Sequence, residues 1–467
     1  MSAGAAAATS VVWLRHDLRL ADNPALTAAA ERGGPVVVLF VLDDDPAVAR
    51  PRGGASRWWL HGSLASLDAD LRALGSRLVL RRGSAAAEVP AVVAETGAGA
   101  VFWNRRYGEG ERNQDAALKE SLRASGLEVR SFQASLLFEP WHVRRSDGEP
   151  FGVYSAYARA VGALDAPRAP LPAPASLAAP VPLPESDELD DWGLLPTKPD
   201  WAGGLRATWT PGERGGRDRL DAIVERLDRY GEERDRAGAD STSRLSPYLR
   251  TGEVSPFQIW HRVTEADPEG QVSGKYRGEV LWREFNYTLL FAHPRMAEEN
   301  LRPAFDRFPW RTPDPEVLRR WQRGRTGFPL VDAGMRQLWE TGWMHNRVRM
   351  VAASFLIKNL LIDWREGERW FWDTLVDADP ANNAASWQWV AGSGIDPAPF
   401  FRVFNPVLQS RKFDPEGVYL RRWLPELRDL DDASIHEPRG VPGYPEAMVD
   451  LKASRAEALR AFDSISV

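Results

Sequence analysis

The stretch GEVLWREFNYTLL, which begins at Gly278, carries side chains that could recognise a flat, polar substrate. At 3.6 residues per turn, one helical face presents a carboxylate, an indole, a guanidinium and an amide: Glu279, Trp282, Arg283 and Asn286. Such a face can stack on a ring and hydrogen-bond to its polar edge. A solvated, salt-bridging face with one tryptophan lying against it is the alternative interpretation.

A second stretch, STSRLSPYLRTGEVSP from Ser241 to Pro256, places hydroxyl groups and Arg244 where a helix could begin. Backbone N–H groups at the start of a helix, assisted by an arginine, can hold a phosphate. A plain helix cap explains the same residues. The stretch therefore indicates a phosphate site only in combination with other motifs.

A third stretch, GWMHNRVRM, predicts a helix face that combines polar side chains with the flexible, apolar side chain of a methionine. Its residues Asn346, Arg349 and Met350 are spaced i, i+3, i+4 and so lie together. His345 is a candidate acid or base, although a lone histidine more often has a structural hydrogen-bonding role.

Two tryptophans stand out in the fourth stretch, DADPANNAASWQWVAGSGIDPAPFFRVFNP, which starts at Asp377. If SWQW is helical, Trp387 and Trp389 lie about 200° apart around the helix axis. One could then face a cofactor while the other faces a substrate. The alternative places both in the core.

The first third of the chain predicts a parallel sheet that would support these motifs. Short apolar runs alternate there with helical patterns: VVWLR from Val11, VVVLFVLD from Val36, RLVLRR from Arg77, AVFWN from Ala100 and EVRSF from Glu128. This rhythm is typical of βαβ units, and we expect a five-stranded, Rossmann-like α/β domain over residues 1–135. The turn RHDLRLADNP lacks G-x-G-x-x-G, so we do not expect this sheet to hold the main redox cofactor.

The remainder of the chain predicts helices. Long helical periodicities dominate beyond about Leu205, and we expect a larger all-α domain over residues 205–467. The Pro- and Ala-rich composition from Ala166 to Pro199 predicts a semi-rigid connector within residues 136–204, and it should not sustain a helix or strand.

The overall composition limits the classes of function. The 467 residues suffice for at least two domains, and a net charge of −6 requires any nucleic-acid site to be a local basic patch. There is no cysteine, which excludes thiolate chemistry and Cys-ligated metal and fits a reducing compartment. No apolar run approaches the length of a membrane span, so we expect a cytoplasmic protein, without metal and without a membrane partner.

Taken together, the motifs resemble the photolyase and cryptochrome family. The resemblance covers nearly the whole chain and follows that family's order and spacing in TSRLSPYLRTG, LWREF, TGFPLVDAGMRQLWETGWMHNRVRM, IDWREGERWF, NNAASWQW and FRVFNP. The opening RHDLRLADNPAL and the stretch WTPGE at Trp209 belong to the same pattern.

The resemblance implies that FAD lies folded in the helical domain. The positions that it assigns to FAD are Tyr230, Thr242, Ser243, Arg244, Leu245, Ser246, Arg283, Asn346, Arg349, Asp377, Asp379 and Asn383. Arg349 and Asp377 correspond to a pair beside the isoalloxazine ring, and Asn383 to the residue that faces flavin N5. An amide cannot deliver a proton as a carboxylic acid can, so Asn383 should favour the reduced, anionic flavin.

By spacing, Trp387, Trp364 and Trp310 correspond to the family's electron-feeding tryptophan chain, which runs from the flavin to the surface. The positions that correspond to the lesion site are Glu279, Trp282, Asn346, Arg347, Met350, Trp389, Arg402 and Gln409. The implied activity is light-driven repair of cyclobutane pyrimidine dimers, with the dimer extruded into a pocket. Glu279, if buried, should be protonated and donate to the lesion.

The implied partner is UV-damaged DNA. Candidate phosphate contacts are Arg347, Arg402, Arg411 and Lys412, although each of them, taken alone, is more readily explained as a surface charge. No obligatory protein partner is evident, and we expect a monomer.

The resemblance also implies a light-harvesting antenna in the N-terminal domain. We expect 5,10-methenyltetrahydrofolate, with 8-hydroxy-5-deazaflavin as second choice. Glu111 lies at a plausible folate-contacting position, but Gly110 stands where an Asn is expected before it.

Three alternatives share parts of this pattern. A cryptochrome-type blue-light signalling protein is the main one, but Asn383 replaces the Asp expected at N5 and no long tail follows the flavin domain. A six-four photolyase is disfavoured because GWMHNR contains a single His. A flavin electron carrier would leave Glu279, Trp282 and Trp389 without a role.

Overall fold

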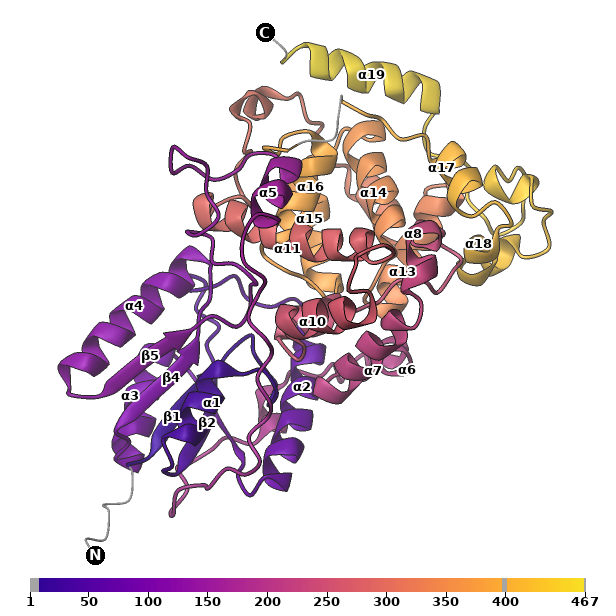
Figure 1. The fold of residues 1–467 in the computed structure, drawn as a ribbon. Coiled ribbons are helices and arrows are strands. Elements are labelled where there is room, and N and C mark those ends of the chain that lie inside the picture. Colours follow the sequence, from indigo (N-terminus) through magenta and orange to yellow (C-terminus); the bar gives the residue numbers. More distant parts are fainter. Residues whose placement is uncertain (1–7, 397–400, 466–467) are drawn as a thin grey trace, which may run out of the picture.

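The computed structural model describes residues 8–396 and 401–465, and it consists of an α/β part followed by a larger helical part (Figure 1). The α/β part contains five parallel strands: β1 (Ser10–Leu14), β2 (Val36–Leu42), β3 (Leu78–Arg82), β4 (Ala100–Asn104) and β5 (Glu128–Phe132). Their order is β3-β2-β1-β4-β5. The first three strands are therefore added toward one edge of the sheet, and β4 and β5 are added on the other side of β1 toward the opposite edge. The predicted fold class is confirmed.

Helices cover both faces of this sheet. They are α1 (Pro24–Glu31), α2 (Gly54–Ala73), α3 (Ala85–Thr96) and α4 (Glu109–Ala124). Because successive strand residues point to opposite faces, Val12 and Leu14 pack with α1 and α2, while Val11 and Trp13 pack with α3 and α4. This is a doubly wound arrangement.

The connector between the two parts is ordered by contacts with the sheet domain. Its Pro-rich portion runs back along that domain, where Leu177 N–H donates to Leu74 O at 3.0 Å and Asp187 N–H donates to Leu80 O at 2.8 Å. The connector also contains the helix α5 (Tyr154–Val161) and the short 3-10 helix η1 (Leu189–Trp192). The expectation that Ala166 to Pro199 sustains no helix is therefore wrong at η1, where Trp192 is buried against the sheet domain.

The helical part has elements of very different lengths. They are α6 (Gly203–Thr208), α7 (Glu213–Val224), α8 (Leu227–Glu233), α9 (Ser246–Thr251), α10 (Pro256–Ala266), α11 (Gly274–Ala292), η2 (Pro303–Arg307), α12 (Pro315–Gln322), α13 (Pro329–Thr341), α14 (Asn346–Ser354), η3 (Phe355–Asn359), α15 (Trp364–Thr374), α16 (Asn382–Ala391), α17 (Pro406–Phe413), α18 (Val418–Trp423), η4 (Pro425–Leu427), η5 (Ser434–His436) and α19 (Leu451–Asp463). The largest apolar core lies among α12 to α18 and includes Trp321, Trp364 and Trp387.

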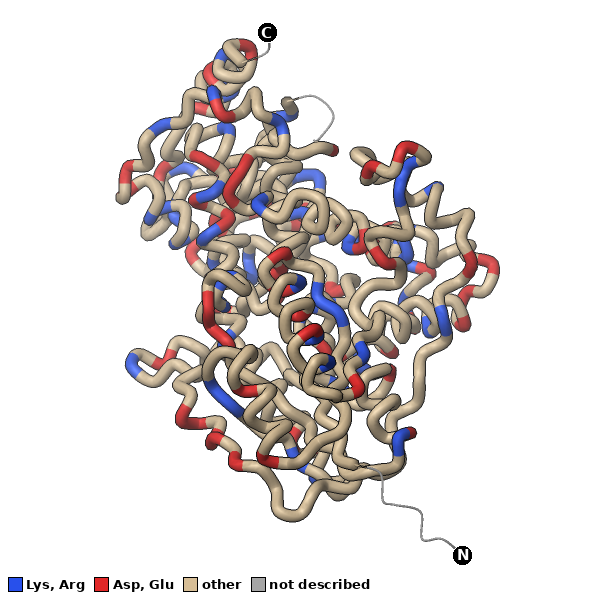
Figure 2. Tube along the Cα trace, turned by 90° about the vertical axis from the view of Figure 1, so that its left-hand side faces the viewer, with Lys and Arg blue, Asp and Glu red and all other residues tan. Residues whose placement is uncertain are grey.

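The two parts are joined through α2, which packs against α15 and α7. Glu253 fixes this junction, because its buried carboxylate accepts from Trp59 Nε1 at 3.1 Å, from Ser63 Oγ at 2.5 Å and from Gly212 N at 2.6 Å. Figure 2 shows Lys and Arg residues interspersed with Asp and Glu residues along the chain. Within residues 8–396 and 401–465, no helix has the length and apolar character needed to cross a bilayer.

Candidate functional site

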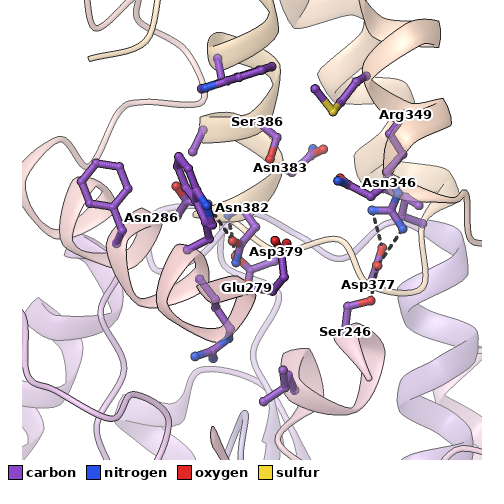
Figure 3. Close-up of a pocket in the computed structure, with 18 of the residues that line it drawn as sticks. Ser246, Glu279, Asn286, Asn346, Arg349, Asp377, Asp379, Asn382, Asn383 and Ser386 are labelled. Carbon is purple, nitrogen blue, oxygen red and sulfur yellow. Dashed lines mark hydrogen bonds and ion pairs between the residues drawn. The ribbon is translucent and has the colours of Figure 1, made fainter. Parts of the chain in front are cut away.

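A cavity of about 530 Å³ lies in the helical part between α9, α11, α14 and α16. Polar side chains from all four helices are gathered around it, as Figure 3 shows. Most of the residues assigned from the sequence line it: Tyr230, Thr242, Ser243, Arg244, Leu245, Ser246, Glu279, Trp282, Arg283, Asn286, Asn346, Arg349, Met350, Asp377, Asp379, Asn383, Trp387 and Trp389. The four separate stretches thus form one site.

The face of α11 is turned toward this cavity, as its spacing predicted. Glu279 forms an ion pair with Arg234, whose Nη1 donates to Glu279 Oε1. The Glu279 side chain is 40% exposed. Protonation of Glu279 was expected only if it were buried, and that condition is not met. Trp282 stacks on Tyr154 of α5 with ring centroids 3.8 Å apart and planes 8° from parallel, so the connector helix holds this indole in place.

The loop before α9 is tightly folded. Arg244 has a φ of +53°, a conformation that non-glycine residues rarely adopt and that is often found at functional sites. Its guanidinium pairs with Asp240 at 2.8 Å, and its buried Nε has no partner within residues 8–396 and 401–465. Burial lowers the pKa of Arg244. A buried donor that none of the described residues satisfies fits a site for a phosphate or another anionic group.

Arg349 and Asp377 form a bidentate ion pair. Arg349 Nη1 and Nη2 donate to the two Asp377 carboxylate oxygens at 3.2 and 2.9 Å, and Ser246 Oγ donates to the same group at 2.6 Å. Arg349 Nε also donates to Met344 O at 2.7 Å. Because these contacts join α9, α14 and the segment before α16, they fix one wall of the cavity.

Asp379 organises the start of α16. Its Oδ1 accepts from Ala381 N at 3.0 Å and from Asn382 N and Nδ2 at 2.8 Å each, while Oδ2 accepts from Tyr287 Oη at 2.7 Å. Asn382 in turn accepts from Asn286 of α11 at 2.9 Å. The carboxylate therefore ties α16 to α11 and positions the residues that follow.

Asn383 has a fixed orientation in the cavity wall. Its Nδ2 donates to Glu368 Oε1 at 2.8 Å and to Glu368 O at 3.1 Å, so both amide hydrogens are used. Since both partners are acceptors, the amide nitrogen must face Glu368, and the carbonyl oxygen is left for the cavity. This oxygen can accept a hydrogen bond from a ligand N–H group. Glu368 is held by Arg50 of the sheet domain at 2.7 and 2.9 Å.

The three tryptophans assigned to an electron-feeding chain occupy different depths. Trp387 lines the cavity and packs edge-on against Phe371 with centroids 5.0 Å apart. Trp364 is fully buried and its Nε1 donates to Asn300 Oδ1 at 2.9 Å. Trp310 is half-buried on the outside of the same core, and its Nε1 has no partner in the part of the chain that the structure describes. All three rings belong to or pack against one core, and their role in electron transfer stays a prediction.

Three residues assigned to the lesion site do not line the cavity: Arg347, Arg402 and Gln409. Arg347 pairs with Asp235 at 2.8 Å. Arg402 is exposed just before α17, and Gln409 is half-buried within that helix. His345 is buried, and its Nδ1 accepts from Arg347 N at 3.2 Å at the start of α14, while burial lowers its pKa to about 4. These features indicate a helix cap for His345.

Several residues of the site were not found from the sequence. Arg234 and Glu368 bind predicted residues directly, and Tyr154 supports Trp282 from the connector. Each of these contacts joins distant parts of the chain, and no local spacing indicates them. Asn382 was the exception, since it adjoins Asn383 in NNAASWQW and could have been included.

Comparison with known proteins gives full-length matches. Residues 10–175 match the family described as DNA photolyase, and residues 276–464 match the FAD binding domain of DNA photolyase. A deoxyribodipyrimidine photo-lyase of Agrobacterium fabrum is 49% identical over 97% of this chain and 98% of its own length. Cryptochrome-1 of Arabidopsis thaliana is 39% identical over 93% of this chain and 65% of its own length.

Solved structures agree with these matches. The crystal structure of a bacterial class III photolyase from Agrobacterium tumefaciens superposes with a TM-score of 0.95 at 48% identity, covering 100% of this chain and 99% of that one. A cryptochrome from Synechocystis superposes with a TM-score of 0.88 at 28% identity, covering 98% of this chain and 99% of that one.

Proposed function

The chain belongs to the DNA photolyase and cryptochrome family, and from that premise we propose that it is a deoxyribodipyrimidine photo-lyase. It repairs cyclobutane pyrimidine dimers in DNA with blue light. The observation that carries this function is a single cavity in which Asn383 and the Arg349–Asp377 pair lie with Glu279, Trp282 and Trp389. The first set of groups suits a flavin, and the second suits an extruded pyrimidine dimer.

The residues fit FAD. The unpartnered Arg244 Nε and the hydroxyls of Thr242 and Ser243 would hold its phosphates, and Arg349 with Asp377 would lie beside the ring. When bound and reduced, FAD supplies on illumination the electron that opens the cyclobutane ring and takes it back. Asn383 offers only its carbonyl oxygen toward the cavity, which suits a ring nitrogen that carries hydrogen.

The lesion would lie against the aromatic side of the cavity. Trp282, already stacked on Tyr154, offers its free face to an unstacked base, and Trp389 offers a second aromatic surface. Glu279 would accept hydrogen bonds from base N–H groups once it is released from Arg234. Extrusion costs less for a dimer than for normal bases because a damaged pair stacks poorly.

The tryptophan chain would carry the electrons that reduce the flavin. Trp387 lies at the cavity, Trp364 in the core and Trp310 toward the outside. An exposed reductant could deliver electrons along this series without entering the DNA-binding cavity. The arrangement of all three rings on one core supports the role.

The damaged strand would be held by local cations, because the net charge of the chain is negative. Arg347 directly follows Asn346 of the cavity lining, Arg402 is exposed before α17, and Arg411 and Lys412 are exposed at the end of that helix. Gln409 on the same helix would add an uncharged contact. We propose that this group receives the phosphates on either side of the lesion.

For the antenna we propose 5,10-methenyltetrahydrofolate, with 8-hydroxy-5-deazaflavin as the second choice. Glu111 supports a folate, since it lies on the sheet domain 3.6 Å from Arg106 and 3.9 Å from His16. Burial and neighbouring arginines, Arg250 and Arg52 first among them, lower the pKa of His16 well below its usual value. A neutral imidazole beside a carboxylate can share hydrogen bonds with a pterin edge.

The proposed partner is UV-damaged DNA, bound by a monomer without a further protein. The proposed location is cytoplasmic, which suits a DNA substrate and a chain without cysteine.

The activity can be measured directly. Purified, reduced protein is incubated with UV-damaged oligothymidine and illuminated with blue light, and thymine absorbance is followed. We expect absorbance to recover only under light. Full flavin content with no recovery would instead favour a signalling or electron-carrying role.

A further inference from the structure

Lys358 is a buried cation outside the cavity described above. Its side chain is 1% exposed, and its Nζ donates to Arg402 O at 2.8 Å and lies 4.5 Å from the centroid of the Phe401 ring. Within residues 8–396 and 401–465, no carboxylate forms an ion pair with it. The ammonium group is therefore held by one main-chain carbonyl and one aromatic face.

This position is energetically unfavourable for a lysine. Burial, with a smaller effect of Arg402, lowers the pKa of Lys358 to about 7. A cation removed from water without a counter-charge costs free energy, and an apolar side chain of similar length would avoid that cost. Fold stability therefore does not account for a lysine at this position. Its hydrogen bond to Arg402 O indicates a role in holding the Arg402 main chain.

The local backbone brings Lys358 to this contact. Helix α14 (Asn346–Ser354) continues into the π-helix η3 (Phe355–Asn359), where Leu360 N–H donates to Phe355 O at 3.1 Å. Such wide turns often occur at functional sites. Four residues before Lys358, the Ser354 Oγ accepts from Phe404 N at 3.3 Å. Two buried side chains of one helical run thus hold both ends of the segment from Arg402 to Phe404.

The segment that they hold presents an arginine to solvent. Phe401 and Phe404 are buried, while Arg402 between them is exposed and lies 4.9 Å from the Phe404 ring centroid. Helix α17 begins directly afterwards, with Asn405 as its cap. The main chain from Arg402 to Phe404 is therefore held at both ends, while the Arg402 guanidinium, which lies against the Phe404 ring, is exposed and can receive a ligand.

We propose that Lys358 is a positioning residue for DNA binding, fixing the main chain of Arg402 so that the Arg402 guanidinium meets a phosphate of the damaged strand. The inference rests on the proposed function, because it needs DNA as the ligand. Lys358 itself touches no phosphate and acts through Arg402 alone.

A double-mutant cycle tests this coupling. Binding of a UV-damaged duplex is measured over a range of salt concentrations for the native protein, Lys358→Met, Arg402→Ala and the double variant. Arg402→Ala should weaken binding up to about fivefold and reduce the salt slope by about 0.9, the loss of one phosphate contact. Lys358→Met should weaken binding in the same direction and also flatten the slope, and the double variant should bind like Arg402→Ala.

The exposed Lys198 provides a matched control, because Lys198→Met removes the same charge far from this segment. Native affinity in Lys358→Met would overturn the proposal, and so would losses that add in the double variant. Flavin content per protein reports whether each variant is folded. If Lys358→Met does not fold, Ser354→Ala releases the other end of the segment and is put through the same cycle.

Failure of the proposed function has a different signature. In that case the native protein itself would not distinguish damaged from undamaged duplex, whatever the variants do. Discrimination by the native protein with an unchanged Lys358→Met would reject the positioning role alone.

Discussion

At the scale of single residues, the orientation of Asn383 is the feature most closely tied to chemistry. Both of its amide hydrogens go to Glu368, so only a carbonyl oxygen faces the cavity. A carboxylate in its place would meet the buried Glu368 carboxylate and place a second negative charge at the cavity wall. The site as built therefore favours a ligand that donates a hydrogen bond there.

Asn383→Asp should accordingly destabilise the anionic reduced flavin. We expect the midpoint potential to become more negative, by about 59 mV for each tenfold change in a one-electron equilibrium. Spectroelectrochemical titration measures this shift. Asn113→Asp on the exposed face of α4 adds the same charge elsewhere and should leave the potential unchanged. Identical reduction and reoxidation spectra for Asn383→Asp and native protein would contradict the assignment.

Glu279 is predicted to contact the lesion rather than the flavin. Glu279→Ala removes the acceptor for base N–H groups and frees Arg234, so the repair quantum yield should fall about tenfold or more while flavin content stays normal. Yield per absorbed photon on damaged oligothymidine is the measurement. Glu265→Ala, an exposed carboxylate on α10, is the control. Repair at full yield in Glu279→Ala would remove this residue from the site.

What the sequence could show at this scale depends on distance along the chain. Glu279, Trp282 and Arg283 were found because helical spacing alone puts them on one face. Arg234 lies 45 residues from Glu279, and its ion pair depends on how α8 packs against α11. Such contacts follow from tertiary packing, which local periodicity does not encode.

At the scale of elements, the π-helix η3 creates a titratable position in the core. Lys358 has a pKa of about 7 in the folded protein and 10.5 in its ordinary state, so the unfolded chain binds this proton more tightly between these values. Below pH 7 both states carry the charge and the folded state bears the full cost of burial. The free energy of unfolding must therefore rise with pH across this window, by at most about 1.4 kcal/mol per pH unit.

Lys358→Met should remove that dependence. We expect the variant to have the higher thermal midpoint at pH 7 and the difference from native protein to shrink by pH 9. Thermal unfolding at the two pH values measures it. A difference that does not change between pH 7 and pH 9 would show that the charge of Lys358 does not limit stability.

The sequence predicted most elements that position the site. The five strands begin and end within one residue of the predicted runs because apolar stretches bounded by turns leave little choice of register. The structure of the connector was harder to predict, because its proline content indicates local stiffness but not the contacts that the segment makes. The role of α5 in supporting Trp282 through Tyr154 depends on those contacts.

At the scale of the whole molecule, the Arg50 side chain of the sheet domain reaches the wall of the flavin cavity through Glu368. Arg50 holds Glu368 and lies 4.3 Å from the Trp372 ring centroid, and Trp372 Nε1 donates back to Pro51 O at 2.8 Å. The sequence predicted both domains but not this junction. Domain composition does not determine how two surfaces meet.

Arg50→Ala should weaken both the junction and the site. It leaves the Glu368 carboxylate buried without its cation, which we expect to cost about 1–3 kcal/mol since Arg50 is itself partly exposed. The thermal midpoint and the rate at which reduced flavin reoxidises in air report the two effects. Arg72→Ala breaks an exposed ion pair on α2 and should change neither. An unchanged reoxidation rate in Arg50→Ala would show that the contact between Arg50 and Glu368 does not affect the flavin site.

We propose that one cavity brings a reduced flavin within electron-transfer range of an extruded pyrimidine dimer. The fluorescence lifetime of the reduced flavin tests it most directly, with UV-damaged and undamaged oligothymidine compared at saturating concentration. We predict a lifetime shortened by the damaged strand alone, with less shortening in Trp282→Ala. Equal lifetimes with the two strands would contradict the account.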